Sequence, residues 1–420
     1  MTMTTTTTTA AITPEEEAAF RQRVREFLTA NARPKAARGD DAAPPSLEPE
    51  SAEEIEASKR FQAALMDAGL GFITWPREAG GQGLTGRHLE LFNEEAATYE
   101  LPIGIYQIGH GMCAPTILEF GTPEQRATHL PDLLRGSKIW CQLYSEPGAG
   151  SDVASLQTKA VRDGDEFVVN GQKVWTSGAH YSDFGILIAR TDPDAPKHRG
   201  ISMFIVDMRT PGIEFRPLRQ ITGEANFNEV FFTDARIPAA NLLGSENDGW
   251  RLAVALLMNE RVAIGAAGEG PSHGGSAPLI RLARATGAIG DPVVRQGLAD
   301  IYTRETIMKF IGLRIRAAQK AGRAPGPEGS LAKLAGAVLA RRSSDLAIRI
   351  AGAAGQAWDE GDGRGSRWSL GVLSAPAHAI AGGTNEIQRG IIGERVLGLP
   401  KEPAVDRDLP FKDLRVGTER

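Results

Sequence analysis

The sequence changes its pattern twice, near residues 138 and 246, and these changes limit the possible folds. Between them, short runs rich in β-branched and aromatic residues predict strands at 186–189, 201–207, 213–216 and 229–232. On either side, at 13–137 and 246–400, the pattern is helical. Strands grouped between two helical regions indicate an α+β protein, mostly α. We expect an N-terminal helical domain, a central small β-barrel or sandwich at 138–245, and a C-terminal helix bundle.

Local signals refine this organisation. Thr13, followed by Pro14 and three glutamates, predicts a helix start with a cap residue, a first-position proline and acids in the first turn. Asn170-Gly171 accepts the positive φ angles of a two-residue turn, so a hairpin is predicted across 167–175. Loops are expected at 33–49, 75–83, 268–276 and 361–366, a disordered tail at 1–12, and a second tail at 401–420.

Composition excludes several classes of protein. The 420 residues carry a formal net charge of -5, which argues against a nucleic-acid or anionic-membrane partner. No apolar run approaches the roughly 18 residues that a transmembrane helix needs, and the threonine-rich start lacks the features of a secretory signal. Two cysteines, Cys113 and Cys141, have no metal-binding spacing and indicate a reducing compartment. We therefore expect a cytoplasmic protein without a metal site.

Two central segments carry the strongest chemical signal. The first, 144–152 (Tyr-Ser-Glu-Pro-Gly-Ala-Gly-Ser-Asp), offers the N–H groups of a glycine-rich loop and two hydroxyls. The second, 173–177 (Lys-Val-Trp-Thr-Ser), presents a large aromatic plane followed by two more hydroxyls. A planar polar heterocycle held without a covalent bond needs hydrogen bonds at its edge and a cover on its face. Taken alone, the loop also fits a tight connection, and Trp175 also fits a core position.

A third segment, 381–389 (Ala-Gly-Gly-Thr-Asn-Glu-Ile-Gln-Arg), opens a helix that we expect to end near Pro400. Thr384 is a good N-cap. The glycines before it allow a phosphate or carbonyl oxygen to approach free N–H groups closely. An ordinary capped helix is the alternative for this segment alone.

In this order the segments resemble the acyl-CoA dehydrogenase family, and the resemblance runs from about Glu15 to Pro400. The family has the same succession of helical, β and helical domains and binds FAD noncovalently. The resemblance implies that a loop and the tryptophan contact the flavin ring, through Gln142, Tyr144, Ser145, Gly150, Ser151, Trp175 and Ser177. It places Thr384 and Glu386 beside the flavin dinucleotide. Gln142 and Tyr144 differ from the side chains expected at their positions.

The resemblance also implies the catalytic base. In medium- and short-chain members a catalytic glutamate stands at the position of Gly382, and glycine cannot move a proton. Enzymes resembling isovaleryl-CoA and long-chain dehydrogenases have glycine there and a glutamate just before an arginine on another helix. Glu260 is therefore the implied base, Arg261 a substrate-binding residue, and the Gly382 N–H a donor to the substrate carbonyl. Helical spacing agrees, since position 260 shares a face with 253, 257 and 264. From the helix alone, a surface glutamate paired with a basic neighbour is the alternative.

Two departures from the family pattern affect the part that serves a flavin across a subunit boundary. Where the family has Arg-x-x-Phe-Gly, this chain has 286–290 (Thr-Gly-Ala-Ile-Gly), which lacks the arginine and the phenylalanine. Arg281 and Arg284 lie close by and are candidates to replace that arginine at the FAD diphosphate. Where the family has Gln-x-x-Gly-Gly, this chain has 349–353 (Arg-Ile-Ala-Gly-Ala). These changes point to a mixed oligomer in which a partner chain supplies the other half-site.

The expected activity is FAD-dependent α,β-dehydrogenation of an acyl-CoA thioester to the trans-2-enoyl-CoA, in fatty acid or lipid metabolism. The family implies electron-transfer flavoprotein as acceptor and a homodimer or homotetramer; a heterotetramer with a related subunit is the other assembly. Two alternatives stay open. One is a non-catalytic or site-sharing subunit of a heteromeric dehydrogenase, and the other is a flavin oxidase or monooxygenase on the same fold. The sequence has no HExxH or GxxxxGK[ST] motif to support a different chemistry.

Overall fold

The computed structural model describes residues 12–35, 49, 51–267, 275–320, 327–357, 367–403 and 406–414, without the side chains of 260–267, 316, 319 and 320. The described residues of the N-terminal region form five α-helices: α1 (Pro14–Asn31), α2 (Ala52–Asp67), α3 (Gly86–Ala96), α4 (Ala114–Phe120) and α5 (Pro123–Arg135). The predicted helix start is confirmed, because Thr13 caps α1 in a reciprocal capping box with Glu16. Stretch 75–83 is loop with one 3-10 turn, Arg77–Ala79. A two-residue strand pair, β1 (Arg33–Pro34) with β2 (Tyr99–Glu100), was not predicted.

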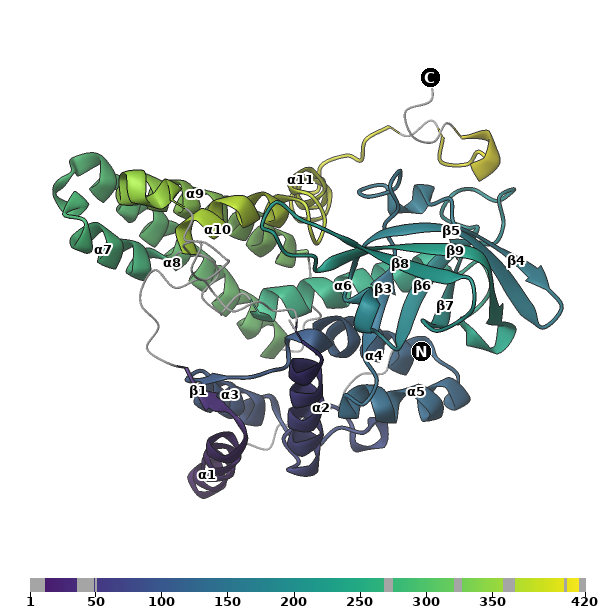
Figure 1. The fold of residues 1–420 in the computed structure, drawn as a ribbon, viewed down its shortest axis with the longest axis horizontal. Helices are drawn as coiled ribbons and strands as arrows, with labels where there is room; N and C mark the ends of the chain where they lie inside the picture. The colour runs from purple at the N-terminus through teal and green to yellow at the C-terminus, as the bar shows by residue number, and fades with distance from the viewer. Residues whose placement is uncertain are drawn as a thin grey trace.

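The central strands form one eight-stranded sheet in the order β10-β7-β6-β4-β5-β9-β8, with β3 paired to β6. Their bounds are β3 (Trp140–Leu143), β4 (Lys159–Asp163), β5 (Glu166–Ser177), β6 (Phe184–Arg190), β7 (Ile201–Asp207), β8 (Ile213–Leu218), β9 (Phe227–Pro238) and β10 (Leu242–Leu243). The four predicted strands are confirmed. Between β4 and β6 only Lys159 and Arg190 pair, and the two halves of the sheet share one core. The sheet therefore folds over itself like a sandwich (Figure 1).

Strands β6 and β7 are buried on both faces. In β6, Leu187 and Ala189 point into the core inside the sheet. Ile186 and Ile188 point the other way, into a core shared with α6 (Gly249–Ala267) and with the π-helical segment Gly109–Cys113 that leads into α4. Successive strand residues face opposite sides, so one strand pair contributes to two cores.

The predicted hairpin across 167–175 is wrong. Residues 166–177 form the single strand β5, which pairs with β9 on one edge and β4 on the other, and the chain turns at Gly164. Gly171 is required for close packing: a Cβ there would lie 2.5 Å from Thr158 Oγ1 and 2.6 Å from Thr158 Cα. Asn170 bonds Asp234 at a β-bulge in β9. The Asn-Gly pair thus marks a close approach of two chain segments, which sequence alone does not distinguish from a turn.

The C-terminal region contains α6, α7 (Ser276–Ala285), α8 (Pro292–Lys320), α9 (Gly329–Ala351), α10 (Arg367–Ser374) and α11 (Asn385–Ile391), which continues as a π-helical turn, Ile392–Val396 (Figure 1). The loops expected at 268–276 and 361–366 fall almost wholly outside the described residues, as does the 1–12 tail. Within the residues described, no helix combines the length and apolar character needed to cross a membrane. The cytoplasmic location stays a prediction.

Part of the segment expected to be a C-terminal tail packs on the β domain (Figure 1). Phe411 is 6% exposed, and the guanidinium carbon of Arg190 lies 3.7 Å from its ring centroid. The Phe411 N–H donates to the carbonyl of Ala195 at 2.9 Å. This contact places 406–414 beside the 192–199 loop, whose Lys197 bonds Asp152 at 2.9 Å.

Candidate functional site

A β-bulge in β5 sets the position of Trp175. The β5–β9 register pairs Lys173 with Val230 and Thr176 with Asn228, so two residues of β5 oppose one of β9. Within this bulge Trp175 has a φ of 61°, a left-handed conformation that is strained for an aromatic residue. The indole is 60% exposed although its neighbours in the strand are buried. Bulges near active sites commonly redirect one side chain in this way.

The same bulge holds the glycine-rich loop. It frees the N–H of Val174 from the ladder, and that N–H donates to the carbonyl of Ser145 at 2.8 Å. The loop closes on itself through two 3.0 Å backbone bonds between Glu146 and Ala149. The two segments singled out in the sequence therefore lie side by side.

A buried ion pair joins the glycine-rich loop to strand β5. Lys173 Nζ lies 2.8 Å from a Glu146 carboxylate oxygen and also donates to the Tyr144 carbonyl at 3.0 Å. The Glu146 carboxylate accepts from the N–H groups of Gln157 and Thr158 at 2.6 and 2.9 Å. Burial alone would raise the pKa of Glu146, but Lys173 and these donors outweigh it and keep that pKa below its ordinary value. Burial lowers the pKa of Lys173, against the opposing effect of Glu146.

The loop borders open space and, among the described residues, carries N–H groups without acceptors. A Cβ placed at Gly148 or Gly150 would meet no atom within 4 Å, so both glycines border open space. Within the part of the chain that the structure describes, the N–H groups of Gly150 and Ser151 donate to no acceptor. Exposed donors beside an exposed indole fit a planar heterocycle with polar edges, which is the chemistry of a flavin ring.

The other predicted flavin contacts differ in exposure. Gln142 is half-buried on β3, paired with Ile186, and Tyr144 is buried. Ser145 is half-buried, whereas Gly150 and Ser151 are exposed. Ser177 ends β5 opposite Phe227, whose ring meets the indole of Trp175 edge-on at 5.7 Å. In the structure Ser145 and the rest of the loop lie beside Trp175, whereas the side chain of Tyr144 is buried in the protein core.

The third predicted segment forms a left-handed turn before α11. Gly382 and Gly383 have φ angles of 65° and 85°, which glycine adopts without steric cost. Thr384 caps α11, as predicted, by accepting the N–H of Ile387 at 3.2 Å. Glu386 is exposed and pairs with Arg389 at 3.2 Å.

The predicted base and the predicted basic residues are only partly described. Glu260 and Arg261 lie on α6, but their side chains fall outside the described part of the chain. Their helix begins in the core, where Leu252, Ala253 and Leu256 are fully buried. On α7, Arg281 and Arg284 are both exposed.

Sequence reasoning did not identify Glu146 and Lys173 as a pair. One signal was available: Phe167, Val169, Gly171 and Lys173 fall on the same alternate positions of the strand. A lysine in register with inward-facing apolar residues requires a buried partner.

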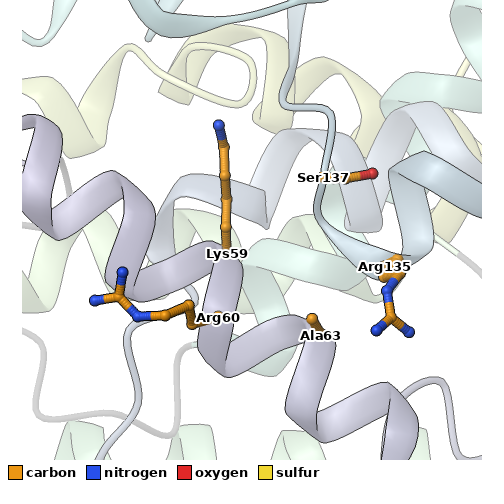
Figure 2. Close-up of a pocket in the computed structure, with 5 residues that line it drawn as sticks. All are labelled: Lys59, Arg60, Ala63, Arg135 and Ser137. Atoms are coloured by element: carbon orange, nitrogen blue, oxygen red, sulfur yellow. The ribbon is translucent and has the colours of Figure 1, made fainter.

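A pocket of about 260 Å³ lies elsewhere, at α2 and the end of α5, lined by Lys59, Arg60, Ala63, Arg135 and Ser137. Its three cationic side chains point in different directions (Figure 2). Arg135 donates to the Asp67 carboxylate through its two terminal guanidinium nitrogens at 2.7 and 2.9 Å, and Lys59 donates to Glu56 at 3.0 Å. These cations do not converge on a common anion position.

Comparison with known proteins identifies relatives over most of the chain. Three family models match, described as acyl-CoA dehydrogenase N-terminal domain at 14–137, middle domain at 141–235 and C-terminal domain at 247–397. Acyl-CoA dehydrogenase IpdE1 of Mycobacterium tuberculosis is 41% identical over 91% of this chain and 98% of that protein.

Solved structures agree with this match. The structure titled Tcur3481-Tcur3483 steroid ACAD superposes with a TM-score of 0.72 at 29% identity, covering 93% of this chain and 99% of that one. The ChsE4-ChsE5 complex from Mycobacterium tuberculosis gives a TM-score of 0.70 at 31% identity, with the same coverage.

Proposed function

The chain belongs to the acyl-CoA dehydrogenase family of oxidoreductases, and from this premise we propose that it binds FAD noncovalently and converts an acyl-CoA thioester to the trans-2-enoyl-CoA. The observation that carries the proposal is the bulge at Val174–Trp175, which exposes an indole and ties it to the glycine-rich loop. FAD held there would supply the acceptor for the hydride that leaves the substrate β-carbon.

The residues of this chain would bind the flavin, remove the substrate proton and stabilise the developing negative charge. Trp175 covers one face of the ring, and the N–H groups of Gly150 and Ser151, with the hydroxyl of Ser177, bind its polar edge. Glu260 removes the α-proton, which moves to its carboxylate as the β-hydride departs. A carboxylate in an apolar, substrate-filled site has a raised pKa, which suits a base. The Gly382 N–H stabilises the negative charge that develops on the thioester oxygen.

We propose an oligomer as the working form, as the family resemblance implies. Four exposed apolar side chains of α8 support this proposal: Tyr302, Ile307, Phe310 and Leu313 are 61%, 51%, 58% and 46% exposed. Exposed apolar surface of this kind marks interaction sites. We expect a dimer or tetramer, homomeric or mixed, and electron-transfer flavoprotein as the physiological acceptor.

A site-sharing role in a mixed oligomer is the second candidate. It is favoured by stretch 286–290, which lacks the arginine and phenylalanine expected of a chain that serves its neighbour's FAD. The titles of two similar structures name protein pairs, Tcur3481-Tcur3483 and ChsE4-ChsE5, and one of them names a steroid enzyme. Bulky polycyclic acyl-CoAs therefore belong in any substrate panel, beside straight and branched ones.

The visible spectrum of the purified protein tests the proposal. We expect a flavin spectrum that bleaches anaerobically with one member of the panel, with the enoyl-CoA as product. A protein that retains no flavin absorbance after incubation with FAD and removal of the free FAD, both alone and with related subunits, would contradict it. Colour that appears only with a related chain would support the site-sharing role. Oxygen consumption coupled to turnover would instead identify an oxidase or monooxygenase.

A further inference from the structure

The Gly382–Thr384 turn is held by hydrogen bonds from two side chains. Lys333, on α9, donates from Nζ to the carbonyl of Gly383. Gln388, on α11, donates from Nε2 to the carbonyl of Gly382 at 2.8 Å. Both carbonyl groups of the glycine pair are therefore fixed by side chains from elsewhere in the helical region.

These two bonds restrict the most flexible backbone of the site. Two successive glycines allow close approach of a ligand but lose more conformational entropy on ordering than any other pair. In a trans peptide the carbonyl and the following N–H point in opposite directions, so the two bonds fix the N–H groups of Gly383 and Thr384, which directly follow Gly382 in the turn. Among the described residues, the N–H groups of Gly382, Gly383 and Thr384 donate to no acceptor. The turn is thereby ordered with its donors available.

Gln388 and Lys333 differ in what they contribute. Gln388 is fully buried, and a Cβ at Gly383 would lie 2.8 Å from its Nε2, so the amide fills the space beside that glycine. Lys333 is half-buried and, within the described residues, forms no ion pair. Its ammonium group adds a positive charge next to the turn, and charge-assisted hydrogen bonds are about twice as strong as neutral ones.

We propose that Lys333 is a positioning residue: through the Gly383 carbonyl it holds the Gly382 turn in the conformation that stabilises negative charge on the substrate carbonyl oxygen. The inference rests on the proposed dehydrogenase function and adds a residue of α9 to its site. Lys333 does not touch the reacting atoms. The charge of Lys333 and its bond to Gly383 preorganise the N–H donors of the turn, so that the backbone reorganises little when the thioester ionises.

The test uses acetoacetyl-CoA, a small thioester whose acidic α-carbon ionises when bound without being oxidised. The FAD-loaded full-length protein is titrated with pH while the absorbance of the bound enolate is recorded. We expect Lys333→Met to raise the apparent ionisation pH by about 1 to 2 units, since each unit corresponds to a tenfold loss of preference for the anion. Lys333→Arg, which keeps a charged donor, should recover most of this loss.

Two further measurements separate this role from others. Urea unfolding and FAD titration of the apoprotein are recorded for each variant. Arg341→Met, on the same helix and paired with Asp345 on the surface, is the matched control and should match the wild type in every readout. A loss of stability or FAD affinity in Lys333→Met with an unchanged ionisation pH would overturn the inference. Failure of the wild type to bind FAD, both alone and with a related chain, would instead contradict the proposed function, and failure of the FAD-loaded wild type to ionise acetoacetyl-CoA would overturn the inferred role of the turn.

Discussion

The ammonium group of Lys173 lies 2.8 Å from the carboxylate of Glu146, and the two side chains are 0% and 6% exposed. Removing one partner of a buried pair leaves an uncompensated charge. We expect Lys173→Met to lower the free energy of unfolding by about 3 kcal/mol or more and to release the loop that carries Gly150 and Ser151.

Urea unfolding and FAD titration measure both effects. The double variant Lys173→Met with Glu146→Gln should recover part of the stability, because neither residue is then charged. Arg236→Met, which breaks exposed pairs with Asp163 and Glu166, is the control and should change little. Equal behaviour of the single and double variants would show that the two charges are not coupled.

We expect Trp175 to lower the stability of the apoprotein and to strengthen FAD binding. In Trp175→Gly the left-handed φ is relieved, which is worth about 1 kcal/mol, and the lost indole was largely exposed. Apoprotein stability should therefore hold or rise, while FAD affinity falls at least roughly tenfold with the loss of a stacking plane. Phe215→Gly on β8, without a positive φ, should instead lose about 1 kcal/mol. A large stability loss in Trp175→Gly would mean that the indole serves packing.

Glu260 is predicted to be the base. Glu260→Gln should keep FAD and acyl-CoA binding but slow flavin reduction by roughly two to four orders of magnitude, measured by anaerobic stopped-flow with the best substrate of the panel. Adding Gly382→Glu should restore part of the rate, reduced by the cost, about 1 to 2 kcal/mol, of a side chain at a φ of 65°. Reduction at the native rate in Glu260→Gln would show that another group takes the proton.

His110 should make stability depend on pH. Its half-buried ring packs against Tyr106 and Phe72, and its Nε2 lies 2.8 Å from the Leu133 carbonyl; desolvation lowers its pKa to about 4. Its unfolded-state pKa is near 6.5, so the unfolded chain binds more protons between these values. Stability is therefore full above about pH 6.5 and falls toward pH 4, by about 3 kcal/mol at most.

Melting temperatures recorded between pH 7 and pH 4 test this dependence. His110→Gln keeps a donor for Leu133 and cannot titrate, so its curve should be flatter across this window. Parallel curves for the two proteins would place the pH dependence on other groups.

Gly171→Ala tests the correction of the predicted hairpin. Because the added Cβ meets the backbone of Thr158, the free energy of unfolding should fall by about 2 to 3 kcal/mol. Gly164→Ala, at a true turn with open space around it, should cost about 1 kcal/mol. Equal costs in thermal unfolding would favour a turn-like role for both glycines.

Much of the fold followed from local pattern. The start of α1, the cap at Thr384 and four strands of the sheet were predictable, because each depends on residues adjacent in the chain. The Asn170-Gly171 error arose because its cause, Thr158, lies on another segment. The bulge at Trp175 was not predictable for the same reason, since it is defined by the register against β9.

The candidate site followed the same division. Sequence identified the loop and the tryptophan, but not the contacts that join them. The Val174 N–H, the Glu146–Lys173 pair and the bond from Lys333 to Gly383 all link segments distant in sequence. Of these contacts, only the buried pair was signalled in the sequence, because Lys173 alternates in register with inward-facing apolar residues. The side chain of Glu260 stays a prediction.

The double-sided burial of β6 and β7 has a consequence for cooperativity. Ile186 and Ile188 are buried by α6 and the π-helical segment, so a fragment cut at the ends of the middle family model would expose the outer face of its own central strands. The three segments that the family models match are therefore not independent folding units. Unfolding of the sheet should carry the first half of α6 with it in one transition, because both draw on the same interior.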